Sequence, residues 1–189
     1  MEAFLVSTGL VALAEIGDKT QLLSLVLAAR YRRPLPIVLG IFASTVLNHA
    51  FAAGLGAWIS NLIGPVWLAR IVGISFLVMA AWILVPDKLE DAEEAAKPKG
   101  HHGIFLTTCI LFFLAEMGDK TQVATVVLGA RYHSLVQVVL GTTFGMMLAN
   151  VPVVYFGDAI SRRVPVAVIR GITAVFFLVL GVLALFWRS

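Results

Sequence analysis

Six long stretches of apolar residues, separated by shorter polar segments, make up most of this sequence. Each stretch reaches the roughly 20 residues that an α-helix needs to cross the hydrocarbon core of a bilayer. The stretches cover residues 3–29, 35–60, 66–85, 104–130, 134–158 and 165–187. This pattern predicts an all-α integral membrane protein with six transmembrane helices and the lipid bilayer as its surroundings.

The most polar segment lies near the middle of the chain. Residues 86–102 read PDKLEDAEEAAKPKGHH and mix acidic, basic and small residues, which is typical of a solvated linker. The adjacent His101 and His102 fit a solvated loop better than a metal site. We therefore expect a first half over residues 1–85, a linker over 86–103 and a second half over 104–189.

A nine-residue motif occurs once in each half. LAEIGDKTQ at Leu13–Gln21 returns as LAEMGDKTQ at Leu114–Gln122 with a single difference, at an offset of 101 residues. Further matches at this offset, such as Ala29-Arg30-Tyr31 with Ala130-Arg131-Tyr132, extend the repeat over nearly the whole chain. Because three spans are an odd number, the second half must enter the membrane from the opposite side. The sequence thus predicts two inverted three-helix repeats, an architecture in which transporters bind their substrate near the midplane.

Composition and charge agree with a membrane protein. Hydrophobic residues make up 60% of the chain and charged residues 13%, whereas a soluble domain is about half apolar and a quarter charged. The net charge of +3 is the modest basic excess that cytoplasmic loops supply, so a nucleic-acid partner is not expected.

The basic residues also predict the orientation. One side of the predicted topology holds Arg70, Arg131 and Arg188, and the other holds Arg30, Arg32, Arg33, Lys88, Lys97, Lys99, Arg162, Arg163 and Arg170. The more basic side of a membrane protein faces the cytoplasm. The linker is therefore expected in the cytoplasm and both termini outside.

Both copies of the motif put charges in the middle of an apolar span. The charged residues are Glu15, Asp18 and Lys19 in the first copy and Glu116, Asp119 and Lys120 in the second. An ionised side chain at that depth costs about 2.5–3.5 kcal/mol on insertion scales, so all of them require a compensating arrangement. On a continuous helix, residues at i, i+3 and i+4 lie on one face and would point together. Alternatively, Gly17 and Gly118 allow close backbone approach or a break in the helix.

Oxygen atoms dominate both copies of the motif. Carboxylate, hydroxyl and amide oxygens without a Cys or His cluster suit hard cations such as Ca²⁺, Mn²⁺ or Mg²⁺. Four carboxylates and two lysines leave a charge of −2, which one divalent cation or two protons would neutralise. We therefore expect exchange of one divalent cation for about two protons, with no bound cofactor. The expected supporting residues are Lys19, Thr20, Gln21, Lys120, Thr121, Gln122, Asn48 and Asn150.

The sequence is compatible with more than one role for several of these side chains. Lys19 and Lys120 either neutralise the carboxylates, extend toward an interface or take part in transport. Asn48 and Asn150 either complete the coordination shell or join neighbouring helices. His49, in the second span, is expected to be a satisfied packing residue rather than a proton relay.

The doubled motif resembles the Gdt-type family of Golgi, chloroplast and bacterial manganese and calcium transporters, which is placed near the LysE-like exporters. The resemblance rests on two copies of E-x-G-D-K-[TS], each in the first span of a three-span half, and on Arg30-Tyr31 after the first copy. It implies proton-coupled antiport of Mn²⁺ or Ca²⁺. For a bacterial member it implies Mn²⁺ export across the inner (plasma) membrane. The ligands that it implies are Glu15, Asp18, Glu116 and Asp119.

Two other functions compete with this one. A LysE-like exporter would use the carboxylates to bind a small organic cation, such as a basic amino acid. An intramembrane metal-dependent hydrolase would need His or nucleophilic side chains beside the carboxylates, and the sequence offers only His49. We therefore expect a transporter and not an enzyme. The oligomeric state stays open, a homo-oligomer included.

Overall fold

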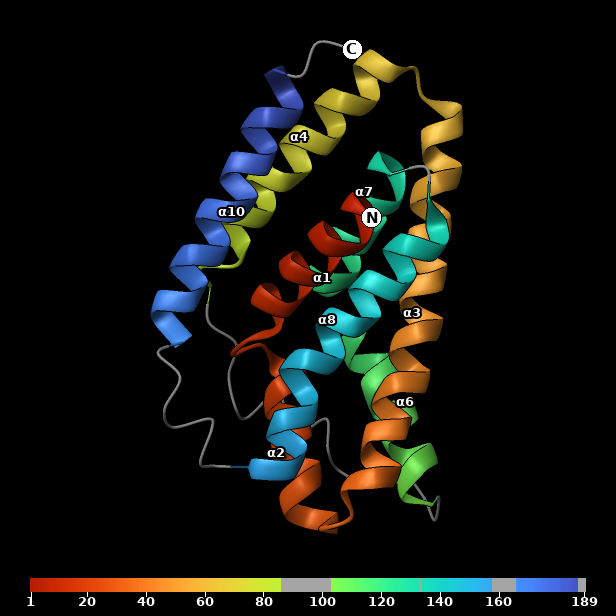
Figure 1. Cartoon of the computed structure of the whole chain (residues 1–189), viewed down its shortest axis with the longest axis vertical. Coiled ribbons are helices and arrows are strands. Elements are labelled where there is room, and N and C mark those ends of the chain that lie inside the picture. The colour runs from red at the N-terminus through yellow and green to blue at the C-terminus, as the bar shows by residue number, and fades with distance from the viewer. Residues whose placement is uncertain (86–102, 133, 158–165, 187–189) are drawn as a thin grey trace.

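The computed structural model describes residues 1–85, 103–132, 134–157 and 166–186 (Figure 1). Within these ranges all regular secondary structure is α-helical. The helices are α1 (Glu2–Glu15), α2 (Lys19–Tyr31), α3 (Pro34–Leu62), α4 (Pro65–Trp82), α6 (Ile104–Glu116), α7 (Lys120–Arg131), α8 (Leu135–Phe156) and α10 (Val166–Phe186). The predicted linker, with His101 and His102, lies outside the described residues except for Gly103.

Four helices match predicted spans closely and are long and apolar enough to cross a membrane. They are α3, α4, α8 and, from Ala167 onward, α10. Pro34 and Pro65 begin α3 and α4, where a missing backbone N–H leaves no helical hydrogen bond unmade. The apolar pattern therefore located these elements to within a few residues.

The other two predicted spans, 3–29 and 104–130, are each broken into two helices. The breaks fall at Ile16–Asp18 and Met117–Asp119, inside the two motif copies. Gly17 has φ 78° and Gly118 has φ 75°, a left-handed conformation that strains residues with a Cβ atom. The expectation that Glu15, Asp18 and Lys19 share a face of one continuous helix is therefore wrong, and the alternative of a helix break is confirmed.

Each half of the chain packs its first helix against the long third helix of the other half. In Figure 1, α1 and α2 run toward the lower end of the molecule, while α6 and α7 run toward the upper end. Helix α1 packs mainly against α8, α6 packs against α3, and α4 packs against α10. Equivalent contacts recur at the offset of 101, since Gly40 faces Phe105 and Thr108 while Gly141 faces Phe4 and Ser7.

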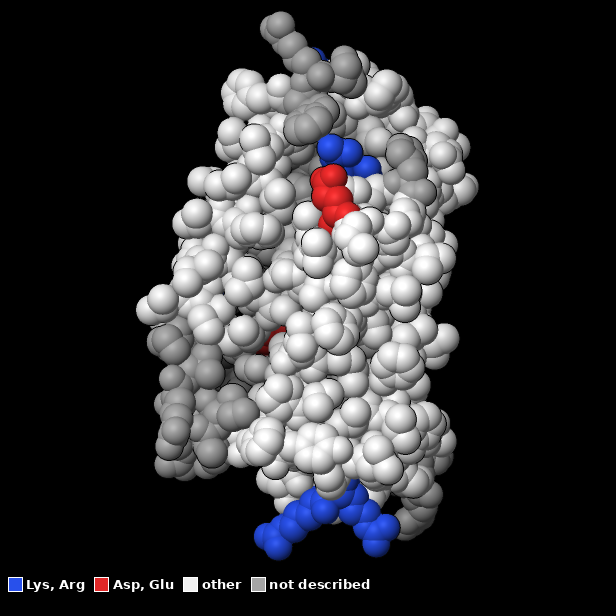
Figure 2. Space-filling view, in the orientation of Figure 1, with Lys and Arg blue, Asp and Glu red and all other residues white. Residues whose placement is uncertain are grey.

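The outside of the molecule is apolar and the inside contains polar side chains. Many large apolar residues are exposed, for example Leu47, Phe51 and Trp67, whereas residues such as Ser44 and Thr142 are fully buried. Figure 2 shows charged side chains near the two ends of the long axis and an almost uncharged middle. An uncharged apolar belt of this kind suits contact with lipid, so the fold is that of a multi-pass membrane protein.

Close packing of α3 on α7 gives a test of the fold. A Cβ atom at Gly56 would collide with the backbone of Val126 and Ala130, whereas one at Gly54 would meet nothing within 4 Å. We expect Gly56→Ala to lower the free energy of unfolding by about 1–3 kcal/mol. Thermal unfolding of the purified protein in detergent measures the change.

The control is Gly54→Ala in the same helix. Alanine favours the helix over glycine by up to about 1 kcal/mol, so this variant should be neutral or slightly stabilised. Equal destabilisation by both substitutions would contradict the packing of α3 against α7.

Candidate cation site

The two helix breaks place the four motif carboxylates at helix ends. Glu15 is the last residue of α1 and Glu116 the last of α6, while Asp18 and Asp119 are the N-caps of α2 and α7. All four are buried, with exposed fractions of 0–3%. The Asp119 carboxylate accepts a hydrogen bond of 2.7 Å from the backbone N–H of Lys120. Helix N-termini favour negative charge, which helps to hold both aspartates in a buried position.

The glutamines of the motif close the breaks. The Gln21 side-chain oxygen accepts from the backbone N–H of Gly17 at 2.8 Å, and the Gln122 oxygen accepts from Gly118 at 2.7 Å. These bonds satisfy N–H groups that the interrupted helices leave without a partner. The glutamine oxygens therefore accept from the backbone in this structure, and their supporting role at a cation site stays a prediction.

Each glutamate accepts a hydrogen bond from a threonine of its own motif, and a side chain of the opposite half lies beside it. Thr20 donates to Glu15, and Thr121 donates to the Glu116 carboxylate at 3.1 Å. Asn150 of α8 donates to Glu15 Oε1 at 3.1 Å. At the equivalent position of α3 stands His49, whose Nε2 lies 3.7 Å from Glu116 Oε2.

The two lysines pair with aspartates of the other motif copy. Lys120 Nζ lies 3.3 Å from Asp18 Oδ1, and Lys19 Nζ lies 3.5 Å from Asp119 Oδ1. Of the three roles considered for the lysines, these contacts support neutralisation of carboxylates. The Lys120 side chain is 4% exposed and that of Lys19 30%, so one pair is more deeply buried than the other.

The carboxylates form one electrostatic cluster. Glu15 experiences repulsion from Glu116, Asp18 and Asp119. Within the described residues, Glu15 Oε2, Glu116 Oε1 and Asp119 Oδ2 are buried without a hydrogen-bond partner. Buried acceptors in this condition are costly and are available to a ligand. In this conformation, no three Asp, Glu, His or Cys side chains of the described part lie close enough together to hold a metal ion.

The asparagines have different surroundings. Asn150 contacts Glu15 directly, and its own oxygen accepts from Ser24 at 2.6 Å. Asn48 accepts from Gln122 at 3.4 Å and donates to the carbonyl of Phe113 at 3.1 Å. Asn150 is therefore a neighbour of the carboxylates, whereas the bonds of Asn48 join helices α3, α6 and α7.

Helix α10 donates two side-chain hydrogen bonds to the backbone of the first motif. Arg170 donates to the Gly17 carbonyl at 3.0 Å, and Thr173 donates to the Leu13 carbonyl at 3.2 Å. The equivalent residues in α4 are Ala69 and Val72, which carry no side-chain donor. The sequence predicted for Arg170 only a place on the more basic side, but a charge inside the apolar stretch 165–187 also indicates a partner in the protein.

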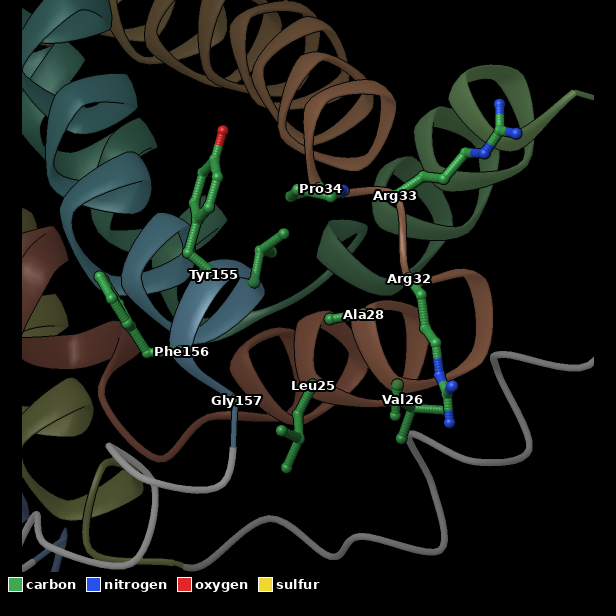
Figure 3. Close-up of a pocket in the computed structure, with 11 residues that line it drawn as sticks. Leu25, Val26, Ala28, Arg32, Arg33, Pro34, Tyr155, Phe156 and Gly157 are labelled. Carbon is green, nitrogen blue, oxygen red and sulfur yellow. The ribbon is translucent and has the colours of Figure 1, made fainter.

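A pocket of the described structure lies away from the motif residues. It has a volume of about 640 Å³ and is lined by parts of α2, α3 and α8, including Leu25, Pro34 and Tyr155. Figure 3 shows Arg32 and Arg33 at its border with side chains that extend away from Tyr155. Its lining includes no motif residue, so the pocket is not the candidate cation site.

Comparisons with known proteins agree on one family. A family model described as divalent cation/proton antiporter GDT1 matches residues 3–91 and 104–188. A Vibrio cholerae protein described as "Putative manganese exporter" is 50% identical over 188 residues, which cover 99% of this chain and 92% of that protein. GDT1-like protein sll0615 of Synechocystis is 30% identical and covers 87% of each chain, and GDT1-like protein 3 of Oryza sativa is 26% identical over 98% of this chain and 74% of its own. No solved structure matches this chain.

The unequal burial of the two ion pairs gives a test of the site. Lys120→Met would leave Asp18 buried opposite an apolar side chain, and breaking a buried pair in this way costs about 3–5 kcal/mol. Lys19→Met removes a partner that is already partly solvated, so its cost should be smaller. Thermal unfolding in detergent compares the two variants, and equal losses would contradict the cross-pairing seen here.

Proposed function

The chain belongs to the GDT1 family of divalent cation/proton antiporters, a transporter family rather than an enzyme family. From this premise we propose that it exports a divalent cation, Mn²⁺ in preference to Ca²⁺, across the bacterial inner (plasma) membrane in exchange for protons. The observation that carries the proposal is the cluster of four buried carboxylates drawn from both motif copies. The description of the Vibrio relative as "Putative manganese exporter" supports the choice of ion.

The cation ligands in this proposal are Glu15, Asp18, Glu116 and Asp119. Each aspartate already has a lysine of the other half within 3.5 Å, so the two ion pairs cancel. The remaining charge of −2 belongs to the glutamates, and each of them has one buried oxygen without a partner in the described residues. One divalent cation neutralises this charge, and two protons do the same, so the two cargoes compete for the same groups.

The helix breaks support a site near the midplane. We propose that α1–α2 and α6–α7 each cross the bilayer as one broken span, which gives six spans in two inverted repeats over 1–85 and 104–189. Broken helices at the centre of a transporter present helix ends and freed backbone groups to an ion. The linker 86–103 then faces the cytoplasm and both termini face outward, and the halves expose the site to each side in turn.

Purified protein in liposomes tests the transport reaction. We expect Mn²⁺ uptake or release to move protons in the opposite direction, recorded with a metal-sensitive dye and a pH-sensitive dye. Loss of a residue that only supports a metal ligand lowers metal affinity about 10–100-fold. Because Glu15 and Glu116 are proposed as direct ligands, Glu15→Gln and Glu116→Gln should lower transport by about 100-fold or more. Metal movement that ignores the proton gradient would contradict antiport.

The matched control is Glu2→Gln, which removes a carboxylate that accepts a hydrogen bond from Tyr132. Glu2 is the first residue of α1 and Tyr132 is the C-cap of α7, so both lie at the helix ends opposite the breaks. This variant should transport like the wild type. Transport of lysine in place of Mn²⁺ and Ca²⁺ would instead favour a LysE-like exporter of organic cations.

The orientation is tested with single cysteines. The chain has one native cysteine, Cys109, so Cys109→Ser provides a cysteine-free background. A cysteine at Lys97 should react with a membrane-impermeant maleimide only after the cell membrane is opened, whereas a cysteine at Ser189 should react in intact spheroplasts. The reverse pattern would place the linker outside.

A further inference from the structure

The two halves of the site differ at one pair of equivalent positions. At the offset of 101, Glu15 corresponds to Glu116, Thr20 to Thr121 and Gln21 to Gln122. The residue that reaches the glutamate from the opposite half breaks this correspondence, because it is Asn150 for Glu15 and His49 for Glu116. The site therefore has amide chemistry on one side and imidazole chemistry on the other.

Asn150 is fully engaged in this structure. Its nitrogen donates to Glu15 at 3.1 Å and to the Met146 carbonyl at 3.1 Å, and its oxygen accepts from Ser24 at 2.6 Å. These bonds position Glu15. Because both polar atoms of Asn150 are already hydrogen-bonded, we do not expect this side chain to bind the cation directly.

His49, in contrast to Asn150, makes no side-chain hydrogen bond to the described residues. Its side chain is completely buried, and neither Nδ1 nor Nε2 has a hydrogen-bond partner among the described residues. The expectation of a packing histidine is confirmed by its burial, but the expectation that its ring is satisfied is wrong among the described residues. A buried polar group left without a partner is destabilising, so a ligand that binds this ring would stabilise the fold.

The spacing between His49 and Glu116 suits two ligands of one metal ion. The 3.7 Å between Nε2 and Oε2 is too long for a hydrogen bond. Two atoms that bind one ion at about 2.2 Å lie about 3.1 Å apart at a right angle, and an angle of about 115° gives the observed separation. Glu116 also keeps Oε1 without a partner in the described part, so the carboxylate has a free oxygen for the same ion.

We propose that His49 Nε2 is a direct ligand of the transported ion and selects first-row transition metals over Ca²⁺ and Mg²⁺. This inference rests on the proposed function, because it adds a nitrogen donor to the carboxylate site. Ca²⁺ and Mg²⁺ are bound through oxygen. Mn²⁺ also favours oxygen, but it begins the first-row series of transition ions, whose affinity for sites with nitrogen donors rises toward Cu²⁺. One nitrogen among several oxygens therefore favours Mn²⁺ over the alkaline-earth ions without creating the His-rich or Cys-rich site that binds Zn²⁺ tightly.

A spectroscopic experiment tests the ligand directly. The other histidines, His101, His102 and His133, are replaced by glutamine, and the protein is purified without a histidine tag, so that His49 is the one histidine left. Mn²⁺ is added, and electron spin-echo modulation is recorded with natural-abundance and ¹⁵N-labelled histidine. We expect nitrogen coupling that changes with the label. Bound Mn²⁺ without a label-dependent coupling would overturn the proposal, and this test needs no substitution at position 49.

Transport selectivity provides the second measurement. His49→Asn is the matched substitution, because the equivalent position of the other half already holds an asparagine beside a glutamate. We expect the ratio of Mn²⁺ to Ca²⁺ transport rates in liposomes to fall by about tenfold or more. The Asn150→Gln variant, which keeps an amide and adds no nitrogen ligand, should leave that ratio unchanged even where the rate falls.

The outcomes separate this inference from the function on which it rests. If the wild type exchanges Mn²⁺ for protons and His49→Asn keeps the same Mn²⁺ to Ca²⁺ ratio, the role of His49 is refuted while antiport stands. If the wild type moves no divalent cation, both proposals fail together. If His49→Asn does not fold, His49→Gln is used for the transport measurement. The spin-echo spectrum with labelled histidine needs no variant at position 49 and decides whether His49 binds Mn²⁺.

Discussion

Reciprocal ion pairs between the two motif copies are the interaction on which this structure depends. Asp18 with Lys120 and Lys19 with Asp119 bring opposite charges within 3.3–3.5 Å, and three of these four side chains are buried while Lys19 is 30% exposed. A buried charge without a partner is strongly destabilising. Since each pair takes one residue from each half, each half stabilises buried charge of the other.

The pairs also explain why the helices break where they do. A continuous helix would keep the aspartates inside a hydrogen-bonded backbone, whereas the breaks turn Asp18 and Asp119 into N-caps. Gly17 and Gly118 supply the left-handed conformation, and the glutamines four residues later satisfy their N–H groups. A motif of nine residues thus contains the charge, the break and the group that stabilises the break.

Much of the fold could be predicted from the sequence, but the cross-pairing could not. Apolar length located α3, α4, α8 and α10 because lipid contact requires continuous apolar helices. The glycines left two possibilities, a continuous helix or a break, because glycine is compatible with both. Which aspartate each lysine would meet depends on how the halves pack, and no local pattern contains that information. The difference between His49 and Asn150 was visible at the offset of 101, yet it had meaning only once both were seen beside a glutamate.

The hydrogen bonds from α10 to the first motif affect the relative free energies of the transport conformations. Two conformations related by the repeat have equal free energy only if every contact in one half has a counterpart in the other. Arg170 and Thr173 bond to the backbone of the first motif, and their equivalents Ala69 and Val72 offer nothing similar. If the halves exchange roles during transport, these contacts favour one of the two conformations as the resting state. A peripheral helix then contributes to that preference, in addition to the difference between Asn150 and His49 beside the glutamates.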